Sequence, residues 1–193
     1  MERKQLPIGI SDYKLIIEDD YYFVDKTNFA RQLLEEGNLI TLIPRPRRFG
    51  KTLNLSILRY FYEKTEGNIY RHLFEGMNIE RWEHFEKYQG KYPVIMLTLK
   101  DCKGETFEDT LKLISKVLQQ EYIRHQYLLK DEMNEGYRRQ FMALINAQAN
   151  LGDCQDALSL LSYLLTVHHG IPPLVLLDEI DTPIHISFDK YYY

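Results

Sequence analysis

The stretch PRPRRFGKT at residues 44–52 decides the fold class, together with the segments on either side of it. Before it stands a short β-rich apolar run, residues 39–43, of the kind typical of a buried parallel strand. After it, apolar residues recur every three to four positions, which predicts a helix. A strand, a loop ending in G-K-[ST] and a helix form the pattern of a phosphate-binding loop.

Three residues of this loop carry the chemistry that the pattern needs. Gly50 lets the backbone approach an anion, Lys51 is long enough to reach the β and γ phosphates, and Thr52 offers a hydroxyl to Mg²⁺. Lys51 is therefore also a candidate catalytic residue. The predicted nucleotide contacts are Arg47, Arg48, Phe49, Gly50, Lys51, Thr52 and Leu53.

The loop departs from the general pattern at its first glycine, where this chain has Arg45. Prolines at positions 44 and 46 can preset a bent loop at low entropic cost. Arg45, Arg47, Arg48 and Lys51 place four positive charges within seven residues. These charges form either a solvated basic loop or a second layer around a triphosphate. For the G-K-T motif itself, the alternative to phosphate binding is a chance occurrence of these residues at a helix start.

A second motif lies near the other end of the chain, in PLVLLDEIDTP at residues 173–183. An apolar strand here ends in carboxylates, as in P-loop ATPases. In that arrangement Asp178 holds Mg²⁺ and Glu179 polarises the water that attacks the γ-phosphate. The alternative is a solvent-exposed acidic turn ended by Pro183.

The remaining segments alternate between strand and helix patterns, and we expect one domain over residues 1–193. Strands are predicted at 39–43, 92–99 and 174–177. Helices are predicted at 25–36, after residue 52, from 106 towards 129, at 135–146 and at 153–169. The last of these helices is predicted to begin at an Asp153 cap and to end at Gly170. This alternation predicts an α/β fold with a mostly parallel sheet and helices on both faces. Ligands should bind where the strands end, after Ile43, Leu99 and Leu177.

The composition excludes several classes of protein. The chain has 193 residues, 45% of them hydrophobic, and a formal charge of -4, so it is neither a disordered tail nor a protein with an overall basic field for nucleic acid or membrane. It has two cysteines, and we find neither a signal-peptide pattern nor a membrane-spanning apolar stretch, which favours a soluble cytoplasmic protein. Nucleic-acid contact through residues 45–51 and a homo-oligomeric state stay open.

With both motifs placed, the chain resembles the AAA-ATPase-like family of bacterial and archaeal proteins. The resemblance rests on LPIGISDY at 6–13, YFVDKT at 22–27, PRPRRFGKTLNLS at 44–56 and LDEIDTPI at 177–184. It implies a P-loop NTPase fold in which Lys51 and Thr52 contact phosphate and Mg²⁺. It likewise implies that Asp178 is the Mg²⁺ carboxylate and Glu179 the hydrolytic one, and that residues 22–27 lie near the adenine.

In that family this module usually precedes a polar sensor strand, a helical lid and a PD-(D/E)XK nuclease-like domain. We therefore expect the chain to be the N-terminal portion of such a protein, truncated at its C-terminus, without an assignable nuclease site. The implied function is Mg-ATP binding and slow hydrolysis that regulates an attached effector. The alternatives are a nucleotide-gated interaction module without turnover and a phosphotransferase.

The sequence favours structural roles for three further sets of residues. His168 and His169 stand at a predicted helix C-terminus, where cations interact well with the helix dipole. Asp181 and His185 lack a third metal ligand nearby in the sequence. The aromatic run at 21–23 is typical of packing at a domain edge and less so of base stacking.

Overall fold

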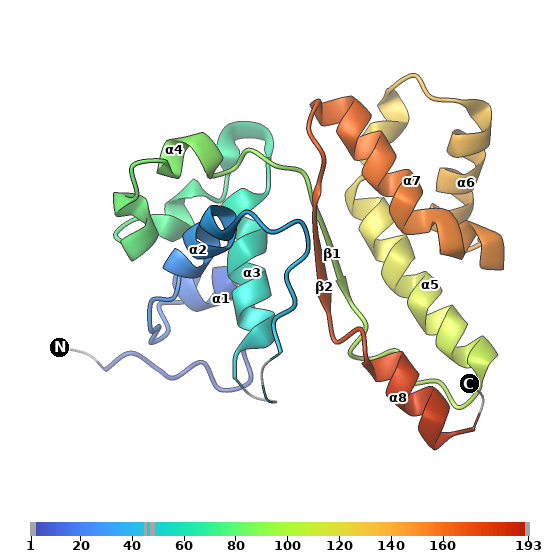
Figure 1. Ribbon diagram of the computed structural model, residues 1–193, viewed down its shortest axis with the longest axis horizontal. Helices are drawn as coiled ribbons and strands as arrows, with labels where there is room; N and C mark the ends of the chain where they lie inside the picture. Colours follow the sequence, from blue (N-terminus) through green and yellow to red (C-terminus); the bar gives the residue numbers. More distant parts are fainter. Residues whose placement is uncertain (1–2, 45, 47–48, 192–193) are drawn as a thin grey trace. The chain divides into compact units, whose positions relative to one another are not determined.

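The computed structural model describes residues 3–44, 46 and 49–191. The chain divides into two compact units, Met1–Val94 and Ile95–Tyr193, which Figure 1 shows in blue to green and in green to red. Within the described ranges, no helix is both long enough and apolar enough to cross a membrane.

The first unit is built from short helices around one central helix. Its α-helices are α1 (Tyr13–Glu18), α2 (Asn28–Glu36), α3 (Lys51–Tyr62) and α4 (Phe85–Tyr88), and its 3₁₀ helices are η1 (Glu66–Asn68), η2 (Arg71–Phe74) and η3 (Asn78–Arg81). The helix predicted after residue 52 is confirmed as α3. The stretch between α3 and α4, which shows no clear periodicity, forms the three 3₁₀ turns.

Aromatic side chains on α3 form the core of the first unit. The Phe61 ring is fully buried and meets the rings of Phe74 and Phe85 edge-on, with centroids 5.3 and 5.7 Å away. The Tyr13 hydroxyl donates to the Leu73 carbonyl at 2.7 Å. Burial raises the pKa of Tyr13, so this hydroxyl stays a hydrogen-bond donor over the whole physiological range.

The second unit packs three long helices beside a small sheet (Figure 1). Its helices are α5 (Phe107–Arg124), η4 (Gln126–Lys130), α6 (Glu135–Ile145), α7 (Leu151–His169) and α8 (Thr182–Asp189). Strands β1 (Val94–Thr98) and β2 (Leu174–Asp178) form a parallel two-stranded sheet. Its core is an apolar cluster from α5, η4, α6, α7 and β1: Ile95, Leu97, Leu118, Tyr122, Leu128, Phe141, Leu144, Ala157, Leu160, Leu161, Leu164 and Leu165.

The ends of α7 show how local chemistry sets the helix limits. Asn150, and not Asp153, is the N-cap: its side chain accepts from the Asp153 N–H at 3.0 Å, and the Asp153 carboxylate accepts from the Asn150 N–H at 2.9 Å. This capping box moves the helix start two residues ahead of the predicted one. Gly170 closes the helix in the left-handed conformation, as predicted.

The predicted strand at 39–43 is wrong. These residues follow α2 without forming a strand, and Leu39, Ile40 and Leu42 are 99, 86 and 79% exposed. An apolar β-rich run becomes a strand only when another strand pairs with its backbone groups, and the sheet of the described residues consists of β1 and β2. The sheet is therefore smaller than predicted.

The buried carboxylate of Glu121 accepts a backbone hydrogen bond at the edge of β1 that faces away from β2. The Met96 N–H donates to Glu121 Oε1 at 2.9 Å, and Arg124 Nε donates to Glu121 Oε2 at 3.0 Å. Burial alone would raise the pKa of Glu121, but hydrogen bonds from His125 and Arg124, the Arg124 charge and the Met96 N–H together lower it to about 2.

This depressed pKa predicts an acid-sensitive second unit. Because the carboxyl has the lower pKa in the folded state, its stabilisation is complete above the unfolded value near 4.5 and is lost as the pH falls towards 2. The loss should be on the order of 3 kcal/mol. Urea unfolding between pH 7 and pH 2.5 checks it: stability should fall more steeply in the wild type than in Glu121→Gln, and parallel curves would contradict the assignment.

Candidate functional site

The start of α3 presents a helix end without a capping side chain. Its N-cap is Gly50, in the left-handed conformation at φ 72°, ψ 27°, and no acidic residue lies in the first turn. The Gly50 carbonyl accepts from the Asn54 N–H at 2.9 Å, which begins the helical ladder. The helix has 12 residues, so the positive end of its dipole points into the Gly-Lys-Thr turn.

The predicted nucleotide contacts around this turn differ in exposure. Phe49 is 62% exposed, and Lys51, Thr52 and Leu53 are half-buried on the first turn of α3. Arg45, Arg47 and Arg48 lie outside the described residues. The described part of the loop therefore keeps Lys51 accessible at the amide end of the helix.

The left-handed turn gives a stability prediction for Gly50→Ala. A Cβ at this position would meet no atom within 4 Å, so the cost comes from the backbone conformation and not from a clash. We expect a loss of about 1–2 kcal/mol of unfolding free energy. Urea titration checks it, and a variant as stable as the wild type would show that the turn is not left-handed in solution.

The acidic motif occupies the carboxyl end of β2. Asp178 is the last residue of the strand and is 3% exposed, and its carbonyl accepts from the Leu99 N–H at 3.0 Å. The alternative of a solvent-exposed acidic turn is therefore wrong for Asp178. Pro183 does not end a turn either, because it lies in the first turn of α8, where a proline is well tolerated.

Glu179 has an unusual backbone conformation. Its φ of 50° lies in the left-handed region, which is uncommon for a residue other than glycine. Its half-buried side chain accepts from the Thr182 hydroxyl at 3.5 Å, at the start of α8. Such strained positions concentrate at functional sites, so the conformation supports a functional interpretation of this residue.

The two motifs belong to different units of the chain. Lys51 and Thr52 lie in the first unit, and Asp178 and Glu179 in the second. Among the described residues there is no group of three or more His, Cys, Asp or Glu side chains that could hold a metal. Mg²⁺ does not require three such side chains, because it usually binds to one or two protein oxygens and completes its coordination shell with phosphates and water.

The segment at 22–27, which the family resemblance places near the adenine, has structural contacts. The Asp25 carboxylate accepts from the Thr27 N–H at 2.8 Å and from the Asn78 N–H at 2.6 Å, and so holds η3 against the start of α2. Phe23 packs on Tyr13, with ring centroids 5.3 Å apart, as predicted for this aromatic run. Tyr22 is 54% exposed.

The histidines also have protein partners. His168 Nδ1 lies 2.5 Å from Asp131, His169 Nε2 lies 2.9 Å from the Tyr127 hydroxyl, and His185 pairs with Asp181 at 3.4 Å. The first two contacts join the end of α7 to η4 and its C-cap Asp131, and the third is an exposed pair at the start of α8.

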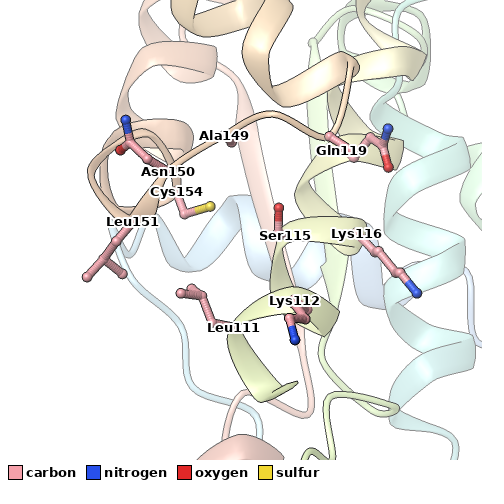
Figure 2. A pocket seen from close by; sticks show the side chains of 10 residues that line it. Leu111, Lys112, Ser115, Lys116, Gln119, Ala149, Asn150, Leu151 and Cys154 are labelled. Atoms are coloured by element: carbon pink, nitrogen blue, oxygen red, sulfur yellow. The ribbon is translucent and has the colours of Figure 1, made fainter. Parts of the chain in front are cut away.

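Two cavities of the described structure can be compared with the predicted site residues, and one of them includes Tyr22, Phe23 and Asp25, from the segment that the resemblance places near the adenine. One of about 320 Å³ lies between α5 and the start of α7, where Lys116 points away from Leu151 and Cys154 (Figure 2). Another of about 380 Å³ in the first unit is lined by Lys4, Ile16, Ile17, Asp20, Tyr21, Tyr22, Phe23, Asp25 and Met77. Neither includes Lys51, Thr52, Asp178 or Glu179 in its lining.

Comparison with known proteins places the chain in a family. Residues 7–193 match the family described as "Predicted AAA-ATPase", and the chain belongs to it. A protein of Azotobacter chroococcum mcd 1, described as "Uncharacterized protein in vnfD 5'region", is 34% identical over 186 residues. This match covers 95% of the chain but 30% of the relative's length. No solved structure gives a significant match. Membership of the family suggests nucleotide binding or ATPase activity.

Proposed function

We propose that the chain binds Mg-ATP and hydrolyses it slowly, with the phosphates at the start of α3. The observation that supports this most is the end of α3 itself: a left-handed glycine cap, no capping side chain and no acidic first turn, followed by Lys51 and Thr52. A helix end of this kind attracts anions through its amide groups and its dipole.

Each proposed site residue has a separate role. Lys51 places its charge on the β and γ phosphates, and the amides of the turn, from Gly50 to Leu53, orient them. Thr52 and Asp178 are the oxygen ligands for Mg²⁺. Bound Mg²⁺ would neutralise the charge that develops between the transferred and the leaving phosphate.

Glu179 is the proposed base. As a carboxylate directly after the metal ligand, it would orient a water and take up its proton during attack on the γ-phosphate. The left-handed backbone at Glu179 turns the chain between β2 and α8. Arg47, Arg48 and Phe49 would add contacts around the nucleotide.

A thermal-shift experiment tests nucleotide binding. A ligand at about 100 times its dissociation constant stabilises a folded protein by roughly 2.7 kcal/mol, so Mg-ATP should raise the melting temperature of the wild type clearly. Lys51→Ala should lose the shift. Lys64→Ala, which removes an exposed lysine just beyond α3, should keep it. If no Mg-nucleotide shifts the wild type, the proposal fails.

We further propose that in a longer protein the nucleotide state regulates an attached effector, for which the family resemblance implies a nuclease-like domain. In such a protein the effector's activity should depend on Mg-ATP and should lose that dependence in Lys51→Ala. An effector equally active with and without nucleotide would contradict this extension.

A further inference from the structure

We propose that Glu121 is a positioning residue for Asp178, acting through the strand pair β1–β2. The expected effect of Glu121 on Mg²⁺ binding rests on the proposed function. Its structural basis lies entirely within the second unit.

Glu121 occupies the place that a neighbouring strand would take on β1. The Leu99 N–H points to β2, where the Asp178 carbonyl accepts it at 3.0 Å. Because backbone groups alternate along a strand, the Met96 N–H points to the opposite edge. There it donates to Glu121 Oε1 at 2.9 Å. The Glu121 carboxylate, on α5, thus provides the hydrogen-bond acceptor for the Met96 N–H at the free edge of β1.

The carboxylate is held rigidly enough to act as a support. Its side chain is 7% exposed, Arg124 donates to it through Nε at 3.0 Å, and the buried His125 ring lies 3.5 Å away at Nε2. Glu121 and Arg124 lie in the last turn of α5 and His125 is its C-cap, so that a spacing of three and four residues brings the three side chains together. A buried carboxylate with these partners is costly to disturb.

Two hydrogen bonds connect Glu121 through β1 to Asp178, the proposed metal ligand. Glu121 holds the edge of β1 at Met96, and the Leu99 N–H, just after β1, holds the carbonyl of Asp178, the last residue of β2. A change at Glu121 should therefore alter the position of the Asp178 carboxylate. Residues that orient a metal ligand typically change metal affinity 10–100-fold when they are removed.

Two variants separate the hydrogen bond from the charge. Glu121→Ala removes both, whereas Glu121→Gln keeps an oxygen that can accept the Met96 N–H but loses the ion pair with Arg124. Gln120→Ala changes the exposed neighbour on the same turn and serves as the control. Each variant is studied at a temperature where it is folded.

Two measurements are made on each variant: hydrogen exchange at Met96 and Leu99, and the Mg²⁺ concentration that half-saturates the Mg-dependent part of ATP binding. We expect Glu121→Ala to exchange faster at both amides and to need about tenfold more Mg²⁺, with ATP affinity in the absence of Mg²⁺ unchanged. Glu121→Gln should recover part of both effects, and Gln120→Ala should match the wild type. If Glu121→Ala does not fold, Glu121→Gln decides, because it should then still need several-fold more Mg²⁺ than the control.

The outcomes that overturn the inference differ from those that overturn the proposed function. Faster exchange with an unchanged Mg²⁺ requirement would make Glu121 a structural residue only. Unchanged exchange at Leu99 would remove the link to β2. If wild-type protein binds no nucleotide in a Mg²⁺-dependent way, the proposed function fails and the link to the metal with it, while the exchange data still decide whether Glu121 holds the strand pair.

Discussion

Glu179→Gln should lower the rate of ATP hydrolysis by about 10²–10⁴-fold and leave Mg-ATP binding close to that of the wild type. Glutamine has the same size and can keep the hydrogen bond from the Thr182 hydroxyl, so the turn between β2 and α8 should be preserved. What the variant loses is the ability to take up a proton from water. Loss of turnover with retained binding is the signature of a general base.

Phosphate release and nucleotide binding must be measured on the same preparations. Asp189→Asn, which neutralises an exposed carboxylate at the end of α8, should retain both activities. Equal loss of binding and turnover in Glu179→Gln would contradict the assigned role. If the wild type itself binds ATP without releasing phosphate, the chain is a nucleotide-gated module and not a hydrolase.

Phe61→Ala should give the largest loss of stability, about 3–5 kcal/mol, because it empties the centre of the first unit. The ring is fully buried and is surrounded by Phe74, Phe85 and Tyr62 at centroid distances of 4.9–5.7 Å. Alanine would leave a cavity with aromatic walls that cannot collapse without moving η2 and α4.

Trp82 provides the readout for this variant. It is the single tryptophan of the chain, it is buried, and it lies in the same unit as Phe61. Urea unfolding followed by its fluorescence should show an early transition for Phe61→Ala. Ile69→Ala, at a 56% exposed position of the same unit, should stay within about 0.5 kcal/mol of the wild type. Similar transitions for both variants would contradict the packing described for the first unit.

Those elements whose limits follow from local chemistry could be predicted from the sequence. The apolar periodicity and the Gly-Lys-Thr turn predict α3, and the residues 92–99 predicted as a strand contain β1. The strand ending at Asp178 is predicted by its apolar run, which the carboxylates follow directly in the sequence. In each of these cases, neighbouring residues carry enough information.

Features that depend on distant partners could not be predicted in this way. The run at 39–43 has a strand-like composition, but a strand also needs a partner, and composition says nothing about one. Glu121 looks like one more polar residue on an amphipathic helix, and its role depends on Met96, 25 residues earlier. The spacing of Glu121, Arg124 and His125 was the available signal, but such spacing is equally typical of a solvent-exposed helix face.

Isothermal titration of ATP over a series of Mg²⁺ concentrations tests the central claim most directly, since that claim assigns Lys51 to the phosphates and Asp178 to Mg²⁺. We expect Mg²⁺ to strengthen ATP binding in the wild type. Lys51→Ala should bind weakly at every Mg²⁺ concentration, and Asp178→Asn should match the wild type without Mg²⁺ but lose the strengthening. Wild-type protein that binds no ATP, or Asp178→Asn that keeps the full Mg²⁺ dependence, would contradict the account.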